Sequence, residues 1–100
     1  MVKIKLVTAK IIAAESIPNA NKLLKLQVDT GTEKRQIVAG IAEYFQPENL
    51  VGKTIILVAN LQPAQIRGIR SEGMLLAAKK DGRLTLLTTL DDLGAGAAIS

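Results

Sequence analysis

The side chains that most often perform catalysis or bind metals are scarce in this sequence. It contains neither histidine nor cysteine, so the commonest general base, the commonest metal ligand and the thiol nucleophile are all missing. Ser71 stands beside Glu72, but no histidine or suitably spaced lysine could activate its hydroxyl. Asp91 and Asp92 supply too few oxygen ligands for a hard cation, and the glycine spacing matches no phosphate-binding loop. We therefore expect no enzyme activity, no metal site and no nucleotide cofactor.

Positive charge is the remaining feature of the sequence that could support a function. Thirteen Lys and Arg against nine Asp and Glu give a formal net charge of +4, and a basic excess favours polyanions, of which nucleic acid is the usual one. Arg67 and Arg70 lie in the stretch 60–78, where Gly68 and Gly73 punctuate a connection between two expected strands. Loops between rigid elements often carry binding residues. The alternative is an ordinary strand connection with solvated arginines.

The elements that would position these charges are predominantly strands. Apolar and polar residues alternate with the period of two that is typical of half-buried strands. The strand segments are expected at 2–7 with a continuation at 9–14, and at 22–30, 36–39, 53–60, 74–78 and 83–88. Tight turns are expected at Pro18-Asn19, at 31–33 and at Asp81-Gly82. Segment 41–50 breaks the alternation and predicts a short helix, whereas the Gly- and Ala-rich tail 91–100 should be loosely ordered unless a partner chain holds it.

Five or six short strands with one interposed helix indicate an oligonucleotide/oligosaccharide-binding (OB) fold. We predict an all-β protein whose residues 1–100 form one domain, a five-stranded Greek-key OB-fold barrel with a short helix between strands 3 and 4. An immunoglobulin-like sandwich is the second choice, but it needs about seven strands. No apolar run approaches the length that spans a bilayer, so we expect a cytoplasmic protein without a membrane partner.

The basic residues gather around the second, third and fourth expected strands, the side that such barrels use for oligonucleotides. They are Lys22, Lys25, Lys34, Arg35, Lys53, Arg67 and Arg70. They could equally be solvated charges that keep strand edges unpaired. Tyr44 and Phe45 are the only aromatic residues, so the bases of a single strand would find few rings to stack on. A folded RNA, recognised through phosphates, sugars and shape, is the favoured nucleic acid.

Four segments in the same order resemble the tRNA-binding domain family. They are 18–31 (PNANKLLKLQVDTG), 35–41 (RQIVAGI), 58–61 (VANL) and 66–74 (IRGIRSEGM). That family includes the C-terminal domain of bacterial methionyl-tRNA synthetase, free-standing structure-specific relatives, a cytokine-like domain of synthetase complexes and a small chaperone-like secretion protein. The chain departs from the usual family residues at Ile17 and Asn21, where a histidine and an aspartate often stand.

The resemblance implies a non-catalytic, structure-specific tRNA-binding module, commonly a homodimer, that grips the outer corner of tRNA. It places Asn60, Ser71 and Met74 on the tRNA-facing surface and Arg67 and Arg70 on the adjoining loop. From the residues alone, Met74 could instead be a core residue and Asn60 a turn-forming strand end. The full candidate set for tRNA binding is Asn60, Arg67, Arg70, Ser71, Met74, Lys22, Lys34, Arg35 and Lys53.

The partners expected on this reading are tRNA, a second copy of the chain and an aminoacyl-tRNA synthetase. The module would be free-standing or associated with methionyl-tRNA synthetase, and a start close to the first strand favours an independent polypeptide. Two other functions stay open. The first is a chaperone-like dimer that binds unfolded or secretory peptides in an apolar groove, and the second is a scaffold that joins synthetases.

Overall fold

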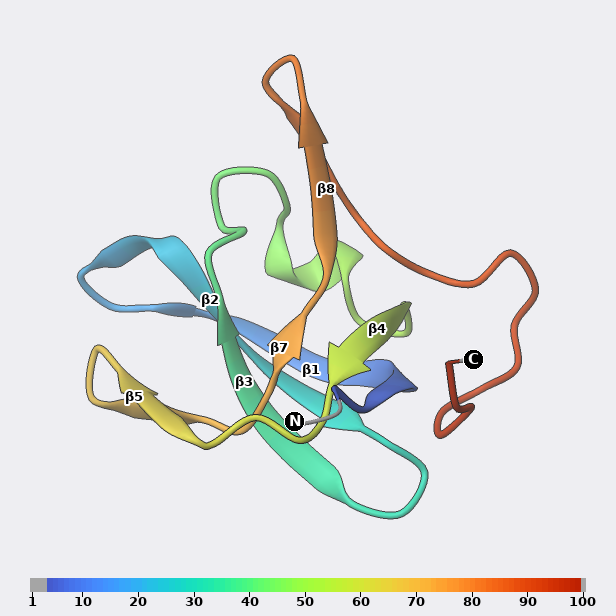
Figure 1. The fold of residues 1–100 in the computed structure, drawn as a ribbon. Coiled ribbons are helices and arrows are strands. Elements are labelled where there is room, and N and C mark those ends of the chain that lie inside the picture. Colours follow the sequence, from blue (N-terminus) through green and yellow to red (C-terminus); the bar gives the residue numbers. More distant parts are fainter. Residues whose placement is uncertain (1–3, 100) are drawn as a thin grey trace.

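Across residues 4–99, the part of the chain that the computed structural model describes, the ordered elements are β-strands and one 3-10 turn (Figure 1). The strands are β1 (Leu6–Ile17), β2 (Ala20–Asp29), β3 (Lys34–Ala39), β4 (Thr54–Val58), β5 (Ala64–Ile66), β6 (Ile69–Ser71), β7 (Met74–Leu75), β8 (Ala77–Lys80) and β9 (Arg83–Leu86). The predicted all-β class is confirmed. Over the same residues, no helix is long and apolar enough to cross a membrane.

Five strands form one antiparallel sheet in the order β3-β2-β1-β4-β7, and β5–β6 and β8–β9 are separate hairpins. The alternation read from the sequence holds in β2, where Leu24, Leu26 and Val28 are buried while the residues between them are partly exposed. Strand β1 is long, in line with the expected continuation at 9–14, and it is irregular because its pairing with β2 shifts register between Ile11 and Ala13. Such a bulge bends the strand around the core.

The five predicted strands form one sheet, but the predicted barrel is not closed. Strands β3 and β7 are the two edges of the sheet, and no strand ladder joins them within the described residues. The gap is crossed instead by the link between β6 and β7, whose Glu72 N–H donates to the Gln36 carbonyl at 2.8 Å. Strand β7 has only two residues, and a Cβ on the preceding Gly73 would lie 3.0 Å from the Val58 carbonyl oxygen. The chain therefore runs so close to β4 that it pairs there and not with β3.

The prediction of a short helix between strands 3 and 4 is also wrong. The segment contains one turn in which the Tyr44 and Phe45 N–H groups both donate to the Ile41 carbonyl, at 3.0 and 3.1 Å. A 3-10 turn follows at Pro47–Asn49, with the proline at its start. Proline disfavours the helical region for the residue before it, and Gln46 is indeed extended with ψ 139°. The two turns consequently stay separate and do not merge into a helix.

The C-terminal tail, expected to be loosely ordered, is fixed along the edge of β1. Strand β2 ends at Asp29 opposite Lys10, so the first residues of β1 have no partner on that side. The tail takes this place: the Thr8 N–H donates to the Ala97 carbonyl at 2.9 Å, and the Gly96 N–H donates to the Thr8 carbonyl at 2.8 Å. The buried Thr8 hydroxyl donates to the Gly94 carbonyl and accepts from the Ala97 N–H, both at 2.8 Å. These hydrogen bonds extend the pairing of β1 beyond the end of β2.

Candidate nucleic-acid interface

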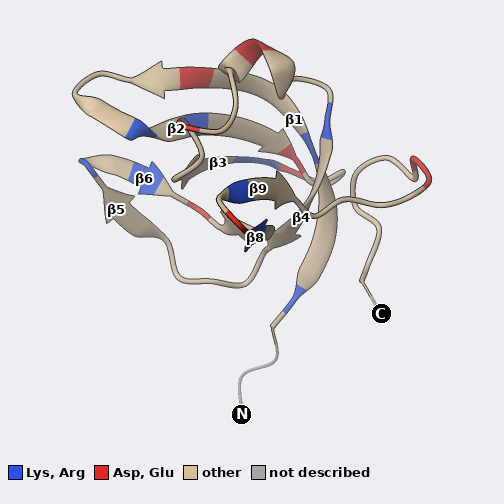
Figure 2. Ribbon diagram, turned by 90° about the horizontal axis from the view of Figure 1, so that it is seen from above, with Lys and Arg blue, Asp and Glu red and all other residues tan. Residues whose placement is uncertain are grey.

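The turns of two hairpins lie side by side at one end of the molecule (Figures 1 and 2). One is the turn Pro18-Asn19 between β1 and β2, and the other is Arg67-Gly68 between β5 and β6. A small apolar cluster joins them. Its members are Ile17, Ala20 and Val38, with Leu23, Ile66 and Ile69 packed against them. Burial of these side chains holds two loops distant in sequence against each other.

This packing brings three exposed cations to the same end of the molecule. Lys22 follows the first turn, Arg67 forms the second, and Arg70 lies in β6. Figure 2 shows the basic segments of β2 and of the β5–β6 hairpin next to each other. We call Lys22, Arg67 and Arg70 the hairpin-end surface. Of the predicted site residues, these three are exposed on the two hairpins that pack together.

Arg67 adopts an unfavourable backbone conformation. Its φ is 54°, and Gly68 follows with φ 79°, so both residues of the turn are left-handed, as a two-residue hairpin loop with Ile66 paired to Ile69 requires. The left-handed region costs a residue with a Cβ about 1–2 kcal/mol, and asparagine or aspartate is better suited to it. Strain of this kind often marks a functional side chain.

Ser71, in contrast, is inside the protein. It is 3% exposed, and its hydroxyl accepts a hydrogen bond from the Val38 N–H at 3.0 Å and donates to the Gly73 carbonyl at 3.1 Å. The hydroxyl is thus occupied in holding the link between β6 and β7 to β3. This arrangement has no place for Ser71 as a nucleophile, and it gives the hydroxyl no free face toward a ligand.

Arg35 is also occupied by the protein itself. Its guanidinium donates to the carbonyls of Ala59 and Glu72, the latter at 3.2 Å, and it forms an ion pair with Glu33 at 2.5 Å. The side chain therefore connects β3 to the end of β4 and to the link after β6. A charge neutralised by Glu33 and committed to two carbonyls is a weak phosphate ligand. Its place in the fold is structural.

Asn60 follows the end of β4, and Met74 begins β7. Met74 is paired with Val58 and is 37% exposed, so it is not the core residue that its sequence position also allowed. Asn60 is exposed, and its side-chain oxygen accepts a hydrogen bond from the Lys5 N–H at 2.9 Å. Both side chains present polar or polarizable surface beside the chain leading into the β5–β6 hairpin.

The remaining two predicted cations are distributed elsewhere. Lys34 is exposed at the start of β3, opposite Asp29. Lys53 precedes β4, where its carbonyl accepts from the Ile11 N–H at 2.9 Å. Asn60 is seven residues further along an extended segment, which corresponds to roughly 23 Å. Lys53 and Asn60 therefore cannot contact the same phosphate.

The β8–β9 hairpin carries basic residues that the sequence reasoning did not select. The Nζ of Lys79 lies 5.6 Å from the centre of the Tyr44 ring, and its hydrogen-bonding and electrostatic interactions with Tyr44 raise the pKa of Lys79 above 10.5. Lys80 and Arg83 flank the turn Asp81-Gly82. The signal was present in the sequence, because a predicted Asp-Gly turn places its two flanking residues opposite each other.

Comparison with known proteins connects this geometry to a family. Over residues 6–98 the chain matches the family described as "Putative tRNA binding domain". It is 57% identical over 98 residues to the methionine–tRNA ligase of Thermotoga maritima, which is 98% of this chain and 16% of that protein. It is 52% identical over 98 residues to the methionine–tRNA ligase of Methanocaldococcus jannaschii, covering 97% of this chain and 15% of the relative. The chain thus spans about a sixth of the length of these relatives.

Solved structures share the fold over nearly the whole chain. A MetRS-related protein from Pyrococcus horikoshii superimposes with a TM-score of 0.90 at 38% identity, covering 97% of this chain and 90% of that one. The chaperone CsaA from Bacillus anthracis gives a TM-score of 0.86 at 29% identity, with the same coverage of 97% and 90%. The resemblance stated from four sequence segments is therefore confirmed, and the chain belongs to the tRNA-binding domain family.

Proposed function

We propose that residues 1–100 form a non-catalytic, structure-specific tRNA-binding module that grips the outer corner of folded tRNA. The observation that carries this proposal is that a chain of this family exposes three cations on two hairpins that pack against each other. Because its relatives include methionine–tRNA ligases, the module works in the cytoplasm with methionyl-tRNA synthetase, as a part of that enzyme or as a separate partner.

Phosphate contacts would supply the affinity. The ion pairs found among residues 4–99 join Lys25 to Glu15 and Arg35 to Glu33. Lys22, Arg67 and Arg70 are outside these pairs, so their charges remain available to an anion. Each phosphate that they neutralise releases condensed counterions, which makes binding depend on salt. Lys34 and Lys53 lie outside the hairpin-end surface and would act as peripheral contacts.

The other candidate residues take different roles in this proposal. Asn60 and Met74 contact the sugars or the shape of the RNA, because both side chains are exposed. Ser71 and Arg35 act indirectly. Their hydrogen bonds fix the segment that carries Arg70 and Met74, so they position the ligand-binding residues without touching the RNA.

The test compares folded tRNA with duplex DNA and single-stranded RNA of equal length at near-physiological salt. We expect a preference for folded tRNA, and we expect Arg67→Ala with Arg70→Ala to weaken binding and to reduce the slope of log K against log salt by about 1–2 units. Lys10→Ala removes an exposed charge from β1 and serves as the control, with the loss of affinity compared per charge removed. Equal binding to all three nucleic acids, or an unchanged slope in the double variant, contradicts the proposal.

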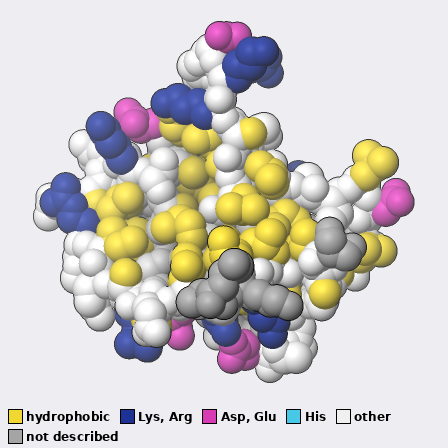
Figure 3. All heavy atoms as spheres, in the orientation of Figure 1, with side chains coloured by type: hydrophobic (Ala, Val, Ile, Leu, Met, Phe, Trp, Pro, Cys, Tyr) yellow, Lys and Arg dark blue, Asp and Glu magenta, His cyan; other side chains and the backbone are white. Residues whose placement is uncertain are grey.

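We further propose that the module is a homodimer. Figure 3 shows a broad apolar face, rimmed by charged side chains of both signs, on one side of the molecule. The chain also exposes large apolar side chains near its C-terminus, where Leu90 is fully exposed and Leu93 is 69% exposed. Leu90→Glu with Leu93→Glu should yield monomers in sedimentation equilibrium. Leu90→Met with Leu93→Met preserves the apolar surface and should remain dimeric, and a wild-type monomer at micromolar concentration contradicts the proposal.

The second candidate function is peptide binding by a chaperone-like dimer. The observation that favours it is the same apolar face together with the likeness to CsaA from Bacillus anthracis. Such a protein would suppress the aggregation of an unfolded client and would ignore added tRNA. Release of the client by tRNA would instead make RNA the primary ligand.

A further inference from the structure

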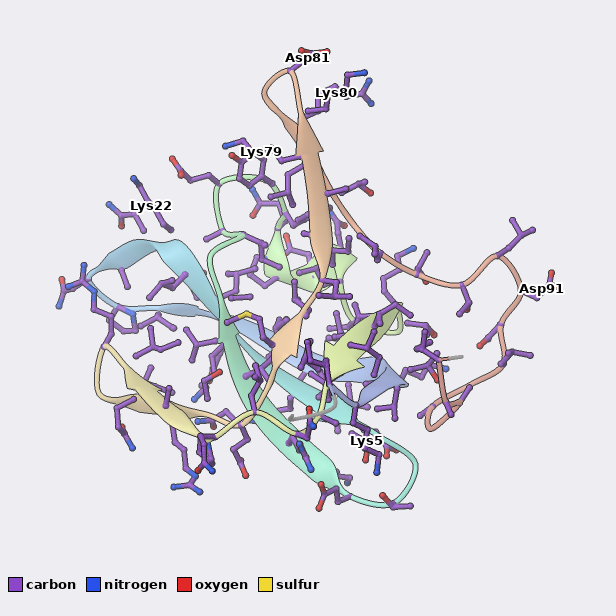
Figure 4. The ribbon with its side chains drawn as sticks, viewed as in Figure 1. Lys5, Lys22, Lys79, Lys80, Asp81 and Asp91 are labelled. Carbon is purple, nitrogen blue, oxygen red and sulfur yellow. The ribbon has the colours of Figure 1, made fainter. Side chains whose placement is uncertain are left out.

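The β8–β9 hairpin projects from the body of the molecule (Figures 1 and 4). Its two strands are joined by Asp81-Gly82, with φ of 53° and 77°, which is the two-residue left-handed turn that fits the twist of a hairpin. The expected Asp-Gly turn is thereby confirmed. It sets the register in which Lys80 stands directly opposite Arg83.

The two faces of this hairpin have different surroundings. Residues opposite each other share a face, and successive residues alternate between faces. One face carries Leu84 and Leu86, which pack against the main core, and Lys79, whose Nζ lies over the Tyr44 ring. The other face carries Lys80 and Arg83 at the tip. Figure 4 shows Lys79 and Lys80 on opposite sides of the hairpin.

Lys80 and Arg83 form a like-charge pair across the hairpin. Directly opposite residues in a hairpin have Cβ atoms about 4.5–5.5 Å apart, and like charges there destabilise the hairpin. Neither side chain takes part in the ion pairs found among residues 4–99, and Asp81 in the adjoining turn forms none with them. An anion bound between the two cations would convert this repulsion into attraction.

The side chains next to this pair on the same face are small, and none of them is aromatic. Ala78 is paired with Thr85, immediately behind Lys80 and Arg83 on the same face. Together with Lys79, Asp81 and Leu84, these four residues line a shallow hollow of about 410 Å³ that is formed entirely by the hairpin. Short side chains leave room for a sugar–phosphate backbone, and the Thr85 hydroxyl can donate to it. A nucleobase would find nothing to stack on.

We propose that Lys80 and Arg83 clamp one phosphate of the RNA backbone, so that the projecting hairpin is a second point of contact on the tRNA held by the hairpin-end surface. The inference rests on the proposed tRNA-binding function and adds to it a site on another hairpin. The Arg83 guanidinium can donate two hydrogen bonds to phosphate oxygens, and the Lys80 ammonium can donate a third. Because the hairpin projects from the body of the molecule, a large anion such as RNA can approach its tip from several directions.

The experiment measures tRNA binding as a function of salt for wild type, Lys80→Thr with Arg83→Thr, and the single variants Lys80→Thr and Lys79→Thr. The double variant should bind roughly tenfold more weakly, with the salt slope lower by about 1. Lys79→Thr removes the same charge one residue away but on the other face, so it should change affinity less than Lys80→Thr. Threonine is favoured in strands, and removal of the repulsion should keep the melting temperature unchanged or raise it.

A variant of opposite sign completes the test. Asp81→Asn removes the carboxylate from the turn and retains a residue suited to its left-handed conformation, so it should bind tRNA more tightly. Wild-type binding with equal losses in Lys79→Thr and Lys80→Thr would overturn the phosphate clamp while leaving the proposed function intact. Absence of tRNA binding by wild type would overturn both.

Discussion

The β5–β6 and β8–β9 hairpins have the same kind of turn and use it differently. Both turns consist of a residue with a Cβ followed by glycine, all in the left-handed region: Arg67-Gly68 and Asp81-Gly82. In β5–β6 the flanking pair is Ile66 with Ile69, which packs against the neighbouring hairpin. In β8–β9 the flanking pair is Lys80 with Arg83, which faces solvent.

The two hairpins differ in the position at which they carry cations that do not stabilise the fold. In the packed hairpin, Arg67 occupies the strained turn position, since the flanking positions are needed for apolar contacts. In the projecting hairpin, aspartate takes the turn position and the cations stand opposite each other. One hairpin thus carries backbone strain and the other carries charge repulsion. In both, a local cost points to a ligand that is not part of the protein.

The largest effect is expected where the packed hairpin is attached to the body. Ser71→Ala leaves the buried Val38 N–H without its partner, which should lower the free energy of unfolding by about 2 kcal/mol. Urea denaturation measures this loss, and Ser16→Ala, at an exposed site in β1, is the control. Amide exchange should become faster in β5–β6 and stay unchanged in β8–β9. A loss no larger than that of the control would remove the distinction between an attached and a projecting hairpin.

An intermediate effect is expected from the turn glycines. A Cβ at Gly68 or Gly82 would meet no atom within 4 Å, and their φ values are 79° and 77°. Gly68→Ala and Gly82→Ala should therefore each destabilise by about 1 kcal/mol through backbone strain alone. Thermal denaturation of the two variants in parallel checks whether their losses of stability are equal. A difference of more than about twofold would show that the two turns are not equivalent.

A smaller effect of opposite sign is expected at Arg67. Asparagine tolerates the left-handed conformation better than arginine, so Arg67→Asn should raise the free energy of unfolding by about 0.5 kcal/mol while weakening tRNA binding. Denaturation and RNA titration on the same preparation separate the two results. If stability falls instead, the strain assigned to Arg67 is offset by contacts of its side chain.

The smallest effect concerns Lys79. Its contact with Tyr44 raises the pKa of Lys79 above 10.5, so the contact stabilises the fold below that pH, and this contribution is lost as the pH rises through the raised value. Tyr44→Phe should bring the pKa of Lys79 down toward 10.5, as measured by NMR titration of the side-chain methylene groups. An unchanged titration curve would mean that the Tyr44 hydroxyl has no part in the shift.

Local patterns determined much of this protein. Alternation in β2 predicted which side chains enter the core, and the dipeptide Asp81-Gly82 predicted a turn and with it the pairing across the hairpin. Four short segments were enough to identify the family. These features depend on neighbours in the sequence, because strand periodicity and turn conformation are set by residues within a few positions of each other.

The tertiary structure decided which candidate residues are accessible. Arg35 and Arg67 are alike in the sequence, but Arg35 reaches carbonyls 24 and 37 residues away, whereas Arg67 stands exposed in a turn. Ser71 is buried where its hydroxyl accepts a hydrogen bond from the Val38 N–H. The tail is ordered because β2 does not extend far enough to pair with the first residues of β1, so the tail bonds to them instead. Each of these outcomes depends on contacts between segments distant in the chain, and no local pattern encodes which of those segments meet.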